Sequence, residues 1–83
     1  MEGEYLKRDL EIIQVILSRM LDRDQINLDE DIYTAGITSI MTLPLLGEIE
    51  DSFNVRIPDP DFLDARTPRA LARLVLRLRT AGA

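Results

Sequence analysis

The 83-residue chain contains no cysteine, no histidine and no tryptophan, and aromatic residues make up only 5% of it. Without cysteine the chain can form neither disulfides nor thiolate metal sites. Without histidine it cannot assemble a Ser-His-Asp or Cys-His nucleophile, and zinc has lost its two commonest ligands. We therefore expect no catalytic residues and no metal site, so a partner enzyme must supply the acid–base groups for any chemistry.

Positive charge and long apolar runs are also scarce. Lysine and arginine number 10 against 15 acidic residues, which gives a net charge of -5 and a pI near 4.5. This balance argues against nucleic-acid binding and favours association with basic protein surfaces. No apolar run approaches the length of a membrane span, and the acidic start Met1-Glu2-Gly3-Glu4 lacks a signal-peptide pattern. We expect no membrane association and a cytoplasmic location.

The remaining composition is that of a small globular protein. Apolar residues make up 46% of the chain, which is enough to form a core. The length predicts a single domain over 1–83, with an ordered part from about 5 to 79, and we expect a monomer. A chain this short has room for one thin core and little room for a deep substrate pocket.

Apolar residues recur at spacings of three and four in three segments, 5–21, 39–53 and 68–79, which predicts three long helices. A short helical piece is expected between Asp59 and Ala65. The predicted fold is all-α, a four-helix bundle with three long helices and one short helix. The predicted core residues are Leu10, Ile13, Leu17, Ile40, Leu43, Leu46, Phe53, Leu71, Leu74 and Leu78.

Local signals fix several helix ends. Thr38 stands at an N-cap position, and Thr67-Pro68 combines a capping hydroxyl with a proline at the first helical position. Pro44 removes one hydrogen bond, so its helix should either kink there or tighten only after Thr42. The polar connection over 22–38 is long for a small domain and needs apolar anchors. The candidate anchors are Ile26, Leu28, Ile32, Tyr33 and Ile37.

The spacing of several short segments along the chain resembles that of the acyl carrier protein family. The order is a long helix, a long loop, a helix that a serine opens, a short helical piece and a final helix. The likeness covers nearly the whole chain, and the joint spacing carries it. The segments are Leu28-Asp29-Glu30-Asp31-Ile32, Gly36-Ile37-Thr38-Ser39-Ile40, Leu46-Gly47-Glu48-Ile49-Glu50-Asp51-Ser52-Phe53 and Ile57-Pro58-Asp59.

The resemblance implies that Ser39 carries covalent 4′-phosphopantetheine, with Thr38 and Ile40 beside it. A serine in the first turn of a helix suits this role, because the backbone N–H groups and the helix dipole favour a phosphate there. The thiol of the arm would hold acyl or aminoacyl groups as thioesters. The implied partners are a phosphopantetheinyl transferase and loading ligases, acyltransferases or synthases, and the chain itself would be a non-catalytic carrier.

Two departures from the family pattern narrow the class of pathway in which this carrier is expected to act. The family usually has Asp before the serine and Leu after it, where this chain has Thr38 and Ile40. The first half of the serine's helix is uncharged, unlike that of many fatty-acid carriers. Both favour a carrier in polyketide, nonribosomal-peptide or aminoacyl-transfer pathways. The candidate partner-binding residues are Met41, Glu48, Glu50 and Asp51.

One alternative and one negative expectation remain. The alternative function is an unmodified helical interaction module that binds partners through an acidic face. The acidic run Asp29-Glu30-Asp31 lacks the spacing and the glycine of a calcium loop, so we expect no cation site there.

Overall fold

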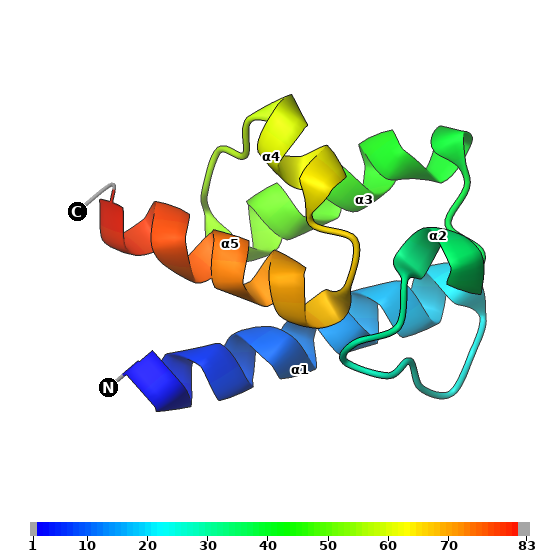
Figure 1. Cartoon of the computed structure of the whole chain (residues 1–83), viewed down its shortest axis with the longest axis horizontal. Coiled ribbons are helices and arrows are strands. Elements are labelled where there is room, and N and C mark those ends of the chain that lie inside the picture. Colours follow the sequence, from blue (N-terminus) through cyan, green and yellow to red (C-terminus); the bar gives the residue numbers. More distant parts are fainter. Residues whose placement is uncertain (1, 82–83) are drawn as a thin grey trace.

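The computed structural model describes residues 2–81, and within that range it is all-helical (Figure 1). The three long helices and the short α4 confirm the predicted fold class. The structure adds α2, a single turn that the sequence reading left inside the long loop. The elements are α1 (Glu2–Leu21), α2 (Ile32–Ala35), α3 (Ser39–Phe53), α4 (Asp59–Asp64) and α5 (Pro68–Ala81).

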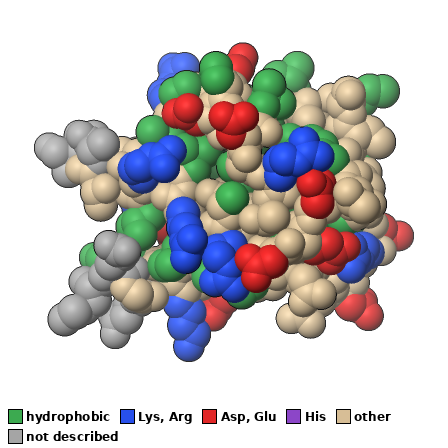
Figure 2. Space-filling view, in the orientation of Figure 1, with side chains coloured by type: hydrophobic (Ala, Val, Ile, Leu, Met, Phe, Trp, Pro, Cys, Tyr) green, Lys and Arg blue, Asp and Glu red, His purple; other side chains and the backbone are tan. Residues whose placement is uncertain are grey.

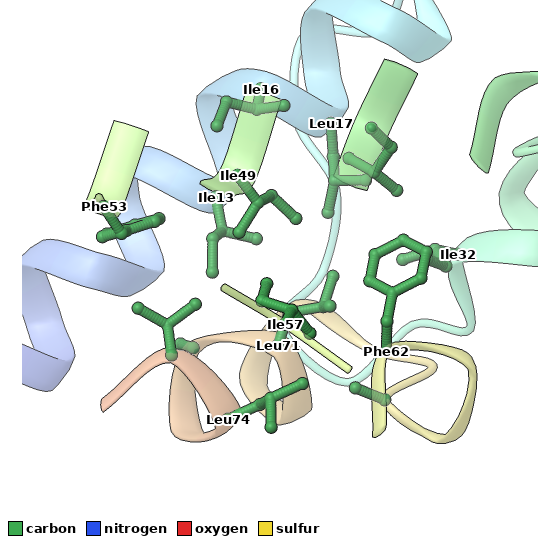
Figure 3. Packing of buried hydrophobic residues seen from close by; sticks show 14 of the residues in the cluster. Ile13, Ile16, Leu17, Ile32, Ile49, Phe53, Ile57, Phe62, Leu71 and Leu74 are labelled. Atoms are coloured by element: carbon green, nitrogen blue, oxygen red, sulfur yellow. The ribbon is translucent and has the colours of Figure 1, made fainter. Parts of the chain in front are cut away.

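The long helices pack around one shared core. α1 and α5 lie side by side and antiparallel, so the start of α1 and the end of α5 lie at the same end of the molecule (Figure 1). α1 also packs on α3, and α4 packs on α5. Buried side chains from all five helices converge in this core, together with Ile57 from the loop before α4 (Figure 3). None of the helices in the described range is long and apolar enough to cross a membrane.

Five predicted core residues, Ile13, Leu17, Phe53, Leu71 and Leu74, are buried. Three more, Leu10, Leu46 and Leu78, are partly buried and pack against the core. Those two groups confirm most of the prediction.

The prediction was wrong for Ile40 and Leu43, which are 87% and 76% exposed. The buried stripe of α3 runs instead through Leu45, Ile49 and Phe53, at intervals of four residues. Nine residues separate Ile40 from Ile49, and at about 3.6 residues per turn they face opposite sides of the helix. The segment is apolar on nearly every side, so its sequence left the buried side open, and contact with α1 chose it.

Four of the five predicted apolar anchors hold the loop before α3, whereas Leu28 is partly exposed and is not among the residues that pack against the core. Ile26, Ile32 and Ile37 are buried, and Tyr33 packs partly buried against the core. Gly36 closes α2 with φ of 134°, a backbone conformation that side-chain-bearing residues rarely adopt.

The predicted helix ends are also largely confirmed. The Thr67 hydroxyl accepts a hydrogen bond from the Ala70 N–H at 3.1 Å, which caps α5. α1 begins earlier and α5 ends later than expected. α3 is helical from Ser39 through Pro44, so the late start that Pro44 suggested does not occur.

Candidate functional site

Ser39 is the first residue of α3 and is exposed to solvent. Thr38 precedes it at the N-cap position with extended backbone, as predicted. The Met41 N–H donates to the Thr38 carbonyl oxygen at 3.0 Å, and the Thr38 N–H donates to the Met41 sulfur at 3.5 Å. The Thr38 hydroxyl faces the Met41 N–H in the manner of a capping box, but it makes no full hydrogen bond, so the main-chain contact closes this end.

The charges around Ser39 suit a phosphodiester. The first turn of α3 contains no acidic residue, so no carboxylate there repels a phosphate. The free N–H groups and the dipole at a helix N-terminus attract one. The Thr42 hydroxyl donates to the Ser39 carbonyl oxygen at 2.6 Å, so it is engaged with the backbone. Ser39 is thus an exposed hydroxyl in the first turn of α3, whereas the Thr42 hydroxyl of the same turn is engaged with the backbone.

The side of α3 next to Ser39 is an uncharged, partly apolar surface. No residue from Ser39 to Gly47 carries a charge. Ile40 and Leu43 project from it largely exposed, and Pro44, which directly follows Leu43, is exposed too. Figure 2 shows hydrophobic side chains projecting from the outline of the molecule over this part of α3. We call Ile40, Leu43 and Pro44 the α3 apolar surface.

The candidate partner-binding residues occupy different surroundings. Met41 is partly buried and packs against the core. The Glu48 carboxylate lies 3.5 Å from the Arg19 guanidinium of α1. The Glu50 carboxylate accepts a hydrogen bond from the Ile57 N–H at 2.9 Å and so holds the loop between α3 and α4. Asp51 is exposed, and eleven residues, or about three turns, place it on the same side of α3 as Ile40.

The acidic run before α2 is paired with three arginines. Asp29 pairs with Arg69 at 2.8 Å, Glu30 with Arg23 at 2.8 Å, and Asp31 with Arg66 at 2.8 Å. Hydrogen bonding from each arginine lowers the pKa of the carboxyl it faces. Among the side chains that the structure describes, no group of three or more is suited to hold a metal ion. The three ion pairs hold this part of the loop in place.

Asp31 also begins α2, a role that the sequence reading missed. Its Oδ1 accepts hydrogen bonds from the N–H groups of Tyr33 and Thr34, at 2.8 and 3.1 Å. An Asp followed by a short apolar stretch and then a glycine is itself a helix start and stop signal. The start and stop residues of α2 were therefore visible in the sequence, but a single turn is too short to show a helical periodicity of apolar residues.

Comparison with known proteins places this geometry in a family. The model of the family described as "Phosphopantetheine attachment site" matches residues 10–75. The chain is 31% identical over 74 residues to the D-alanyl carrier protein of Streptococcus sanguinis, covering 86% of this chain and 94% of that protein. It is 26% identical over 70 residues to the phosphinothricin tripeptide synthetase PhsB of Streptomyces viridochromogenes, covering 84% of this chain but 6% of that protein.

A solved structure shares the fold. BlmI, a type-II acyl carrier protein from Streptomyces verticillus involved in bleomycin biosynthesis, superposes with a TM-score of 0.83. The match covers 99% of this chain and 95% of BlmI, at 18% sequence identity. The family match spans most of the chain and α1 to α5 follow the acyl carrier fold. The chain therefore belongs to the phosphopantetheine attachment site family, whose members are carrier proteins that hold covalent phosphopantetheine.

Proposed function

We propose that Ser39 is the residue to which phosphopantetheine is attached. The observation that carries the proposal is an exposed serine hydroxyl at the first position of α3, in a turn without acids. Thr38 and Ile40 flank it and would lie beside the phosphodiester. The helix N-terminus favours that negative charge. Ser39 lies inside the segment 10–75 that matches the family, which supports the assignment.

The chain has no histidine or cysteine, and the first turn of α3 contains no acid, so no side chain of that turn can act as the base for this attachment. A phosphopantetheinyl transferase would therefore remove the proton from the Ser39 hydroxyl as its oxygen bonds to the phosphorus of a nucleotide-linked phosphopantetheine donor. The bond from that phosphorus to the phosphate of the nucleotide would break, and the nucleotide would leave. The thiol at the end of the arm would be the only thiol on the molecule. It would form the thioester with an acyl or aminoacyl group, and the chain would act as a substrate of partner enzymes without catalysing a step itself.

We propose further that partner enzymes dock on the α3 apolar surface beside Ser39. Large apolar side chains exposed together next to a modification site are typical of a recognition surface. Asp51 lies on the same side of α3 and belongs to the proposed docking surface. Glu48 and Glu50 are engaged with Arg19 and Ile57, so we assign them to the fold of this chain. Met41 contributes mainly to the core.

The relatives support a role in specialised biosynthesis. One is named a tripeptide synthetase, and another is named a D-alanyl carrier protein. The uncharged first half of α3 fits partners that do not depend on an acidic docking face. We propose that the chain carries acyl or aminoacyl groups in a nonribosomal-peptide, polyketide or aminoacyl-transfer pathway, where a ligase, acyltransferase or synthase loads it.

Two serines on the same helix test the attachment site. Ser39 and Ser52 are both exposed, near opposite ends of α3. The chain is co-expressed with a promiscuous phosphopantetheinyl transferase, its intact mass is measured, and the modified peptide is mapped. We expect one phosphopantetheine on the wild type and on Ser52→Ala, and none on Ser39→Ala.

Two results would contradict this proposal. Modification of another hydroxyl, such as that of Thr42, would leave the carrier function standing and overturn the assignment to Ser39. No modification by several different transferases would favour the alternative, an unmodified helical interaction module.

A further inference from the structure

Arg66, which is distant from α2 in the sequence, contacts α2 and its N-cap residue Asp31. Arg66 lies in the loop between α4 and α5, and its Nε donates to Asp31 Oδ2 at 2.8 Å while its Nη2 lies 3.4 Å from Oδ1. Its guanidinium stacks over the Tyr33 ring at 4.7 Å from the centroid. Its carbonyl oxygen accepts a hydrogen bond from the Ile32 N–H at 2.8 Å. One residue thus contacts α2 through a bidentate ion pair, a cation–π contact and the backbone.

A short backbone segment, residues 36–38, connects α2 to Ser39. The Gly36 N–H lies 3.2 Å from the carbonyl oxygens of both Ile32 and Tyr33, and the Ile37 N–H donates to Ile32 at 3.0 Å. The Ile37 side chain is buried, which fixes the chain again just before α3. Only Thr38 separates this fixed point from Ser39.

α2 depends on such outside contacts for its orientation. A helix of four residues forms too few internal hydrogen bonds to be stable by itself. Asp31 caps it, and Arg66 joins that cap to the loop before α5. The ion pair is partly solvent-exposed, with 55% of the Arg66 side chain and 33% of the Asp31 side chain accessible. Exposed pairs contribute little to global stability, so this one acts mainly on local geometry.

We propose that Arg66 is a positioning residue for phosphopantetheine transfer: by holding α2 through Asp31 and Tyr33, it sets where the Ser39 hydroxyl lies relative to the rest of the bundle. The inference rests on the proposed function of Ser39. Attack by a hydroxyl on phosphorus requires close alignment, and small misplacements of a reacting group lower the rate strongly. Arg66 touches neither the serine nor the arm, so its removal should affect turnover more than binding.

The kinetics of a promiscuous transferase acting on the full chain test this role. We expect Arg66→Ala to lower kcat about tenfold with little change in KM. Arg66→Lys keeps the charge but loses the bidentate fork, and it should lose less. Arg56→Ala is the matched control, because Arg56 is also an exposed loop arginine and makes no ion pair within residues 2–81. It should behave as the wild type does.

Hydrogen exchange separates local loosening from unfolding. In Arg66→Ala the amides of Ile32, Gly36 and Ile37 should exchange faster, while those of the α1 and α5 cores stay protected. If Arg66→Ala does not fold, the kcat of Asp31→Asn tests the positioning role instead. It keeps a capping oxygen but loses the charge that pairs with Arg66, and it should also lower kcat.

Unchanged kcat in Arg66→Ala, or in Asp31→Asn where that variant is needed, would overturn the positioning role, as would an equal loss in Arg56→Ala. When the wild type is loaded at Ser39, these results contradict only the positioning role of Arg66 and leave the proposed function of Ser39 standing. A wild-type chain that takes no phosphopantetheine removes the proposed function first, and the positioning role with it.

Discussion

Truncation of two leucines two positions apart in α3 should affect different properties. Leu45→Ala should lower stability, and Leu43→Ala should weaken the binding of partner enzymes. Leu45 is 0% exposed in the core, and Leu43 is 76% exposed on the α3 apolar surface. Replacing each with alanine removes the same atoms from one turn of the same helix. The comparison therefore isolates burial from helix propensity and side-chain chemistry.

The magnitudes differ enough to measure. Removing a fully buried leucine side chain costs about 2–5 kcal/mol, from lost transfer energy and the cavity left behind. A domain of this size has a total stability of about 4–12 kcal/mol. Leu45→Ala should therefore lower Tm by at least about 8 °C, given about 4–8 °C per kcal/mol for small domains. Leu43→Ala should change the free energy of unfolding by less than about 0.5 kcal/mol.

Thermal and urea unfolding followed by circular dichroism measure the stability of both variants. Transferase kinetics on the same samples should show the larger change in KM for Leu43→Ala, because Leu43 belongs to the proposed docking surface. We expect Leu43→Ala to raise KM about fivefold, the effect of losing about 1 kcal/mol of contact. Equal stability losses in both variants would refute the assignment of the buried side of α3. An unchanged KM in Leu43→Ala would refute docking through this surface.

Two further predictions concern a glycine and a buried acid. Gly36→Ala should destabilise the chain by roughly 1–3 kcal/mol, because φ is 134° there and a Cβ would lie 3.1 Å from Leu21 Cδ2. Gly47→Ala, with open space around it in mid-helix, should instead stabilise by about 0.5–1 kcal/mol in urea unfolding. If both substitutions destabilise equally, the backbone argument fails. Asp9 is buried, with one oxygen bonded to Arg79 at 2.6 Å and the other unpartnered. Burial raises the pKa of Asp9 above the ordinary value for an aspartic acid, more than the Arg79 ion pair lowers it. The folded state then binds this proton more tightly than the unfolded state does, so stability from this group is present at low pH and is lost as pH rises through the folded pKa. The Tm of the wild type minus that of Asp9→Asn should fall as pH rises through the raised pKa of Asp9 in the folded state; a difference that grows with pH would show that the ion pair outweighs burial.

The sequence by itself determined the two ends of α3, the start of α5 and the position of Ser39, but not the start of α1 or the end of α5. Thr38 before α3, Asn54 in the left-handed conformation after it, and Thr67-Pro68 before α5 act on neighbouring backbone groups, so they are readable without the fold. α2 was missed because a single turn leaves no periodicity to read. Its cap and its closing glycine were nevertheless present in the sequence.

Only the tertiary structure decided which side of α3 is buried and what each charged residue contacts. Apolar residues occur on nearly every side of the first half of α3, so local pattern left its rotation open, and packing against α1 turned Leu45 and Ile49 inward and Ile40 outward. Arg66 and Asp31 are 35 residues apart, and their pairing depends on where the chain returns. Local signals act over a few residues, whereas burial and ion pairing depend on segments that only folding brings together.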